Sequence, residues 1–145
     1  MKLICYVNGE FVEAGKAKVS AFDHGFLYGD GIFESLTATG GRIFKLREHM
    51  DRLERSARAL RLALPETKER IGEIVKETVR RSGAGEVYIR VVVSRGEGYP
   101  LLDPRVAPRP PLAVLLHAPA PPPAPASPYR AKGAGLRLKT AGVRK

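Results

Sequence analysis

The sequence predicts an α+β domain in which a mostly antiparallel sheet is combined with two helices. Three observations support this fold class. Two short pairs of strand-like segments are joined by glycine turns, two segments have the apolar spacing of amphipathic helices, and two more are apolar and suited to strands. The length of 145 residues fits one ordinary domain with a sizeable core.

Glycine turns define two expected hairpins in the first third of the chain. Asn8-Gly9 is a strong hairpin signal, because a type I′ turn needs positive φ at both central residues. Gly40-Gly41 forms the second turn. The paired strands are expected at Leu3–Val7 with Glu10–Val12, and at Gly31–Ala38 with Arg42–Phe44.

Two helices are expected next. Apolar residues in Leu46–Leu64 recur at intervals of three and four, which places them on one face of a helix. Pro65 is expected to end this helix. Lys68–Arg81 repeats the pattern, and Ser82-Gly83 terminates it.

Two apolar strands complete the expected domain. Glu86–Ser94 is rich in β-branched residues, and Leu112–His117 is a second apolar segment. Alternation along the first of them places Tyr88, Arg90 and Val92 on one face and four apolar residues on the other. The apolar face is expected to lie in the core.

The chain changes character after residue 118. Residues 119–128 contain six prolines, which favour extended geometry and cannot supply ladder donors. We therefore expect a domain over residues 1–118, a linker over 119–130, and the first strand of a truncated second domain within 131–145, at Gly135–Val143. A single strand cannot bury a core alone.

Composition limits the function classes. The formal net charge is +10, which raises nucleic-acid binding as a hypothesis, but the basic residues are spread along the chain and alternate with acidic ones on the first helix. A single cysteine excludes a disulfide framework, and the three histidines lack metal-ligand spacing. No stretch approaches the roughly 18 apolar residues of a membrane span. A cytoplasmic protein without a metal, membrane or nucleic-acid partner is expected.

The densest polar and aromatic cluster is Phe22–Glu34. Its three glycines make a helix an unfavourable choice and allow the backbone to approach another group closely. The cluster fits the wall of a pocket, and it fits equally a structural turn in which Asp23 and His24 cap backbone groups.

Three arginines could bind anions. Arg90, on an otherwise apolar strand, needs a partner, and an internal ion pair is the simpler choice over a substrate carboxylate. Arg95 follows that strand beside two glycines, a weak anion-site signal. Arg52, on the margin of the first helix, either reaches a phosphate or extends to water.

Four segments in this order resemble the class IV (fold-type IV) aminotransferases, which depend on pyridoxal 5′-phosphate (PLP). The resemblance covers nearly the whole chain and matches their amino-terminal domain. It rests on Val7–Val12, Phe22–Glu34, Phe44–Leu53, and Val87–Val91 with Ser94-Arg95-Gly96.

The resemblance implies roles for six residues. Arg52 is similar to the arginine that binds the phosphate of PLP. The other five match positions that line the substrate side, with Arg95 at the place where D-amino-acid aminotransferases bind a substrate carboxylate. These substrate-side residues are Tyr28, Phe33, Tyr88, Arg90 and Arg95.

The resemblance also implies an activity, the transfer of an amino group between an amino acid and a 2-oxo acid by a homodimer. The residues around Tyr88 and Arg90 favour branched-chain substrates, while Arg95 keeps D-amino acids open. Aminodeoxychorismate lyase is an alternative of the same fold, and a non-catalytic basic binding module is an alternative of another class. The family's Schiff-base lysine matches neither Lys139 nor Lys145. It is expected beyond the chain end, so the isolated chain is predicted to be inactive and prone to self-association.

Overall fold

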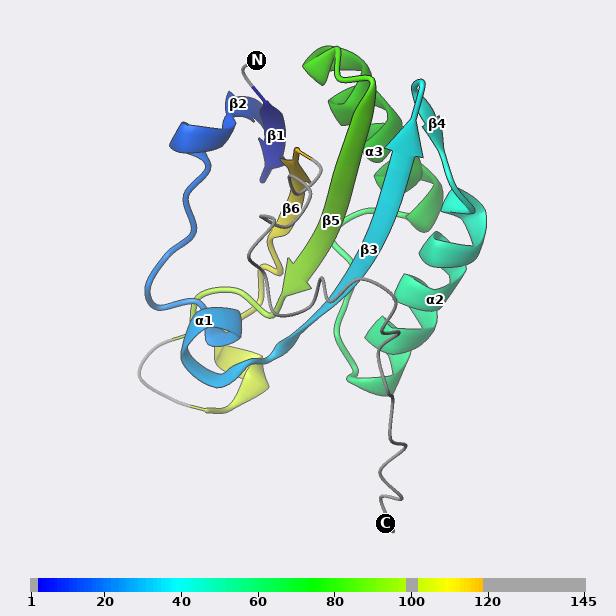
Figure 1. Ribbon diagram of the computed structural model, residues 1–145. Helices are drawn as coiled ribbons and strands as arrows, with labels where there is room; N and C mark the ends of the chain where they lie inside the picture. Colours follow the sequence, from blue (N-terminus) through cyan, green and yellow to red (C-terminus); the bar gives the residue numbers. More distant parts are fainter. Residues whose placement is uncertain (1–2, 99–101, 119–145) are drawn as a thin grey trace, which may run out of the picture.

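A computed structural model describes residues 3–98 and 102–118 of the chain. The expected linker and the strand expected at Gly135–Val143 lie outside these residues. Within them, six antiparallel strands form one sheet in the order β2-β1-β6-β5-β3-β4 (Figure 1). Their bounds are β1 Ile4–Val7, β2 Glu10–Glu13, β3 Gly31–Thr39, β4 Arg42–Ile43, β5 Glu86–Ser94 and β6 Leu112–His117.

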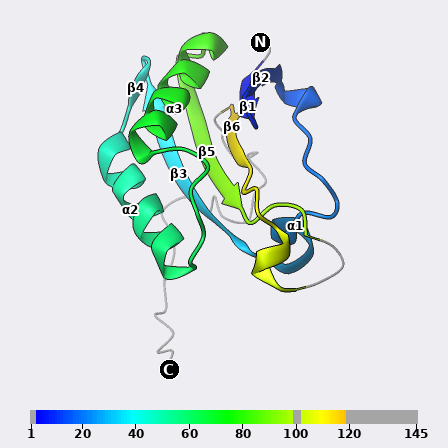
Figure 2. The same cartoon turned by 180° about the vertical axis from the view of Figure 1, so that it is seen from behind.

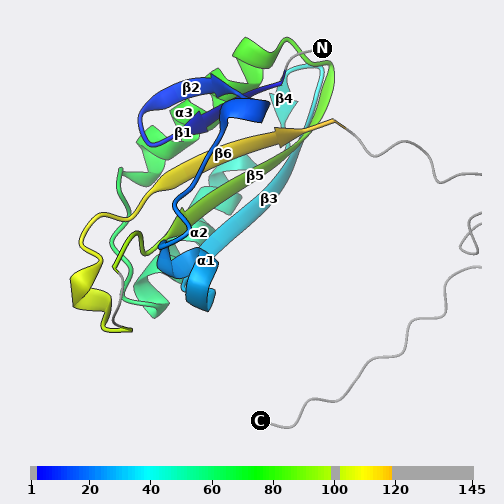
Figure 3. The same ribbon diagram turned by 90° about the vertical axis from the view of Figure 1, so that its left-hand side faces the viewer.

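Two helices cover one face of this sheet. Helix α2 (Leu46–Ala59) packs on β3, and α3 (Lys68–Ser82) packs on α2, β1 and β6. Seen from behind, α3 crosses in front of the sheet and α2 lies alongside β3 (Figure 2). A short helix, α1 (His24–Tyr28), lies near the start of β3 and the end of β5 (Figure 3) and on the other side of the sheet from α2 (Figure 1). The predicted α+β class and the mostly antiparallel sheet are confirmed.

Both glycine turns occur where they were predicted. Asn8 and Gly9 have φ of 47° and 100°, and Gly40 and Gly41 have φ of 56° and 74°. Positive φ at both central residues matches the twist of the flanking strands. Each of the four predicted hairpin strands differs from the observed one by a single residue at one end, and β5 and β6 have the bounds that were predicted.

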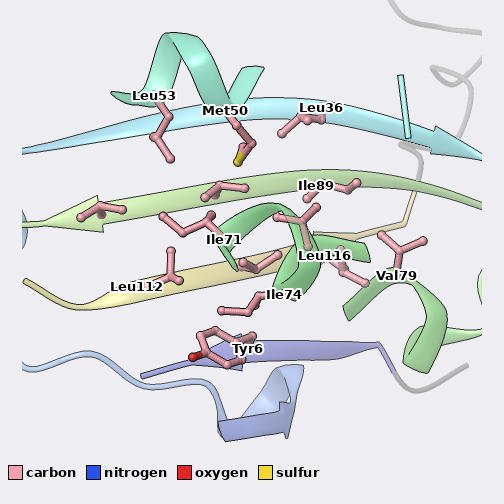
Figure 4. Close-up of a cluster of buried hydrophobic side chains, with 14 of the residues drawn as sticks. Tyr6, Leu36, Met50, Leu53, Ile71, Ile74, Val79, Ile89, Leu112 and Leu116 are labelled. Carbon is pink, nitrogen blue, oxygen red and sulfur yellow. The ribbon is translucent and has the colours of Figure 1, made fainter. Parts of the chain in front are cut away.

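The core lies between the helices and the covered face of the sheet (Figure 4). Apolar side chains from α2, α3 and every second position of β3, β5 and β6 meet there. Leu53, Ile71 and Val91 are completely buried. The alternation that predicted an apolar face for β5 is confirmed, because Val87, Ile89, Val91 and Val93 are all buried.

The predicted end of the first helix was wrong. Helix α2 stops at Ala59, five residues before Leu64, because Arg61 adopts a left-handed φ of 49°. The amide of Leu62 donates to the carbonyl of Ala57 and the amide of Arg61 to that of Arg58, which is the Schellman pattern of a helix end. The chain reversal buries Leu62 and leaves Leu60 half-exposed, so the apolar spacing continued past the true end of the helix.

The expectation that three glycines disfavour a helix within Phe22–Glu34 was also wrong. Asp23 accepts the amide of Gly25 at 2.6 Å and caps α1, and Gly29 closes the helix at a φ of 70°. Gly25 lies inside this helix for a steric reason. A Cβ there would come within 2.6 Å of the Cβ of Ser94, so glycine lets α1 contact the end of β5.

Candidate functional site

An aromatic ring and a guanidinium lie together on the face of the sheet that α2 and α3 leave uncovered. The guanidinium of Arg90 on β5 stacks over the ring of Phe33 on β3, with its central carbon 4.5 Å from the ring centroid. Arg90 pairs with Ser35 in the β3–β5 register, so Phe33 is its diagonal neighbour on the same face. Phe33 is 59% exposed, and this contact therefore lies at the surface of the described residues.

Tyr88 extends this surface along β5. It lies two residues before Arg90 on the same strand, opposite Thr37 of β3, and is half-exposed. The predicted common face of Tyr88 and Arg90 is confirmed. The internal ion pair that was preferred for Arg90 is not confirmed. Among the described residues, the group that contacts this guanidinium is the ring of Phe33.

Helix α1 borders the same surface. An open hollow of about 350 Å³ lies between α1 and the adjoining parts of β3 and β5. Its lining includes Gly25, Phe26, Phe33 and Val92. Tyr28, at the end of α1, packs edge-on against the buried ring of His24 with centroids 5.0 Å apart, and its own ring is partly exposed. The two interpretations of the Phe22–Glu34 segment therefore coexist, since Asp23 caps a helix while neighbouring rings border a hollow.

At the edge of the sheet, Arg52 of α2 is held by a buried carboxylate. Glu34 follows Phe33 on β3 and points to the opposite, helix-covered face. Its Oε1 accepts from Nε of Arg52 at 2.7 Å, and its Oε2 accepts from Nη2 at 2.6 Å. Nδ1 of His49 lies 2.7 Å from the same Oε2. Glu34 is 3% exposed, whereas the side chain of Arg52 is 59% exposed.

The surroundings of Glu34 keep it ionised. Burial raises the pKa of this carboxyl, but hydrogen bonds from Arg52 and His49, together with their charges, outweigh burial and hold the pKa below its ordinary value of 4.5. Because Glu34 is an ionised acceptor, Nδ1 of His49 must carry the hydrogen of their contact.

This shift predicts an acid-sensitive contribution to stability. A carboxyl whose folded pKa is depressed stabilises the fold above its unfolded pKa, and the contribution disappears as the pH falls through the folded pKa. The difference in unfolding free energy between wild type and Glu34→Gln is therefore expected to be full at neutral pH and to shrink below about pH 4.5. Urea denaturation at a series of pH values measures it, and a difference that stays constant with pH would contradict the prediction.

Arg95 lies apart from the exposed surface. Its side chain is 10% exposed, and it forms a two-point ion pair with Asp30, from Nε at 2.6 Å and from Nη2 at 3.0 Å. Nη2 also donates to the carbonyl of Leu60, and Nη1 to that of Arg61. Arg95 thus caps the carboxyl end of α2 and ties it to the segment before β3.

The structure brings some of the predicted residues together and separates others. Phe33, Tyr88 and Arg90 share one face, Tyr28 lies on the neighbouring helix, and Arg52 is joined to β3 through Glu34. Glu34 was not among the predicted site residues. The signal for it was present, because alternation on β3 places its carboxylate in a row with Ile32 and Leu36, where it needs a partner.

The described residues contain neither a cluster of metal ligands nor a helix that could span a membrane. No group of three or more histidine, cysteine, aspartate or glutamate side chains in residues 3–98 and 102–118 is arranged to hold a metal ion. In the same residues, no helix is long and apolar enough to cross a membrane.

Comparison with known proteins gives consistent matches. A family model described as amino-transferase class IV matches residues 31–143. A putative branched-chain-amino-acid aminotransferase of Methanocaldococcus jannaschii is 50% identical over 105 residues, which are 72% of this chain and 36% of that protein. A D-alanine aminotransferase of Staphylococcus haemolyticus is 37% identical over 108 residues, which are 71% of this chain and 38% of that protein. The chain therefore spans little more than a third of the length of either relative.

Solved structures show the same likeness. A branched-chain aminotransferase from Thermoproteus uzoniensis, crystallised with norvaline, superposes with a TM-score of 0.73 at 32% identity, over 81% of this chain and 41% of that one. A second branched-chain amino acid aminotransferase, bound to N-(5′-phosphopyridoxyl)-L-glutamate, also has a TM-score of 0.73 at 32% identity, over 80% of this chain and 40% of that one.

Proposed function

The chain belongs to the class IV aminotransferase family, and from this we propose that it forms the amino-terminal, substrate-facing part of a PLP-dependent aminotransferase. The enzyme would move an amino group between a branched-chain amino acid and a 2-oxo acid. The observation that carries the proposal is the stack of Arg90 on Phe33 beside Tyr88, on the uncovered face of the sheet. By resemblance to the family, we also propose that the whole enzyme is a cytoplasmic homodimer.

The chain offers one fitting contact for the phosphate of PLP. The exposed guanidinium of Arg52 uses Nε and Nη2 for Glu34 and, among the described residues, keeps its Nη1 donors for another acceptor. Guanidinium N–H groups form strong, charge-assisted hydrogen bonds to phosphate oxygens. When bound, PLP supplies the electron sink that amino transfer requires, and the protein supplies binding and orientation.

The exposed side chains of Phe33 and Arg90 suit two kinds of substrate in turn. The ring of Phe33 gives a branched apolar side chain a surface to pack on. The N–H groups of Arg90 can donate to a carboxylate when an acidic 2-oxo acid takes that place. Tyr88, on the same face, would border both. This division favours branched-chain chemistry. The D-amino-acid alternative, which depended on Arg95, loses support because that guanidinium already binds Asp30 and two carbonyls.

The activity test compares two proteins, the 145-residue chain and the product of the longest reading frame that contains it. We expect the longer protein to turn yellow with PLP and to transfer amino groups from L-leucine, L-isoleucine or L-valine to 2-oxoglutarate. The isolated chain should do neither. Absence of both properties in the longer protein would refute the proposal. Activity with D-alanine, or release of an elimination product, would assign it to the D-amino-acid or lyase branch.

A variant tests the role given to Arg90. Arg90→Met keeps an apolar stem over Phe33 but removes the donors, so the KM for 2-oxoglutarate is expected to rise about tenfold while that for a branched monocarboxylic 2-oxo acid changes little. Arg58→Met is the control, because Arg58 pairs with Glu54 on α2 and should leave both values unchanged. An equal change for both 2-oxo acids would contradict the assignment.

A further inference from the structure

The pair formed by Glu34 and Arg52 is unusual in its distribution of burial. The carboxylate is 3% exposed and lies on the core face of β3, whereas the guanidinium that binds it is 59% exposed. Removing a charge from water is costly, and a well-packed apolar side chain at such a position is often as stable or more stable. The half-exposed geometry also limits what the pair adds to stability, because water screens its outer member. Stability alone is therefore a weak explanation for this carboxylate.

The geometry has a clear effect on the direction of Arg52. A carboxylate that binds Nε and Nη2 together fixes the plane of the guanidinium, and at this pair both bonds are shorter than 2.8 Å. The same arrangement turns the remaining Nη1 edge away from Glu34. An unpaired arginine at an exposed helix position would sample many rotamers, and ordering it on binding would cost free energy.

His49 restrains the carboxylate from a second side. Its Nδ1 and Nη2 of Arg52 lie 3.3 Å apart and both donate to Oε2 of Glu34. His49 and Arg52 are one turn apart on α2, so the helix presents both donors to β3 at once. Glu34 is thus hydrogen-bonded to two residues of the same helix, α2, and its carboxylate has little freedom to rotate.

We propose, resting on the function proposed above, that Glu34 is a positioning residue which, together with His49, aims the Nη1 edge of Arg52 at the phosphate group of the bound cofactor. Glu34 does not touch the phosphate in this arrangement. It acts by ordering Arg52 before the anion arrives, so that the interaction does not lose free energy to that ordering.

A double-mutant cycle in the longest reading-frame product tests this role. The variants are Glu34→Gln, Arg52→Ala and the two combined, and the readout is the dissociation constant of the apoprotein for PLP and for pyridoxal, which lacks the phosphate. Glu34→Gln is expected to weaken PLP about tenfold and to leave pyridoxal unchanged. In the Arg52→Ala background, Glu34→Gln should have no further effect, because there is no guanidinium left to position.

Glu77→Gln is the matched control. Glu77 on α3 accepts from Nε and Nη2 of Arg80 at 2.7 and 2.6 Å, which is the same two-point geometry at another place. Its replacement should change neither dissociation constant. Thermal unfolding of every variant separates binding effects from lost folding. If Glu34→Gln does not fold, Glu34→Asp, which keeps the charge but shortens the reach, is judged by the same criteria.

Each outcome has a distinct meaning. Wild-type protein that fails to bind PLP refutes the proposed function itself. Wild-type protein that binds PLP while Glu34→Gln binds it equally well overturns the positioning role and leaves the function standing. Equal weakening of PLP and pyridoxal, or a Glu34→Gln effect that persists without Arg52, shows that Glu34 supports the fold only, and also overturns it.

Discussion

Replacing Arg95 by alanine is expected to lower the free energy of unfolding by about 3 kcal/mol. The substitution removes a buried guanidinium and leaves three groups without their donor, the carboxylate of Asp30 and the carbonyls of Leu60 and Arg61. Breaking a largely buried pair by removing one partner costs more than the pair contributes, because the other charge, on the 27% exposed side chain of Asp30, stays partly desolvated. The carboxyl end of α2 would lose its anchor to the start of β3.

Urea denaturation of the Arg95→Ala variant measures this effect. Arg105→Ala provides the control, because Arg105 makes a comparable two-point pair with Asp103 but is 88% exposed. Its loss should leave the unfolding transition where it is. If Arg95→Ala left stability unchanged, and in the longer protein caused a specific loss of activity toward D-amino acids, the role that sequence resemblance implied for Arg95 would be restored.

Replacing Gly96 by alanine is expected to cost a similar amount, about 3 kcal/mol. Two effects combine at this position. The φ of 99° disfavours any residue with a Cβ, and the Cβ itself would run into the backbone carbonyl of Arg109 and approach Pro111 to 3.3 Å. The carbonyl of Gly96 accepts the amide of His24 at 2.9 Å, so a shift here would also disturb the first residue of α1.

Gly9→Ala separates the two effects. Gly9 has a φ of 100°, nearly that of Gly96, and open space around its Cβ position, so it carries the backbone strain without the collision. We expect a loss of about 1 kcal/mol for this variant. Equal losses for Gly96→Ala and Gly9→Ala, measured by the same denaturation series, would show that the contact with Arg109 relaxes freely and that the prediction is wrong.

Glu34 shows how far a sequence pattern reaches into a site. Alternation along Gly31–Thr39 places the carboxylate on the core face of a strand, and that alone demands a partner. The same rule could not choose the partner. Arg52 and His49 contact Glu34 across separations of 18 and 15 residues because α2 packs on β3. The sequence of either segment alone does not predict this packing.

The ends of the two long helices differ in the same way, because those of α3 have local causes and that of α2 has a tertiary one. The start and end of α3 were predicted within a residue, because Thr67 and Gly83 supply a cap at each end from neighbouring positions. The end of α2 was missed by five residues. There, Arg61 takes a left-handed conformation, Leu62 is buried, and Arg95 binds the last carbonyls from more than 30 residues away.

The sequence by itself determined the elements whose cause is local. These are the two glycine hairpins, the caps of α3, the alternating faces of β5, and hence the common face of Tyr88 and Arg90, which periodicity alone dictates. The tertiary structure decided which group each arginine contacts. Arg90 lies over Phe33, Arg52 is held by Glu34, and Arg95 is committed to Asp30, a residue 65 positions away. An arginine can bind a carboxylate, a ring, a carbonyl or a phosphate, so its partner is fixed only when the fold brings one of them within reach.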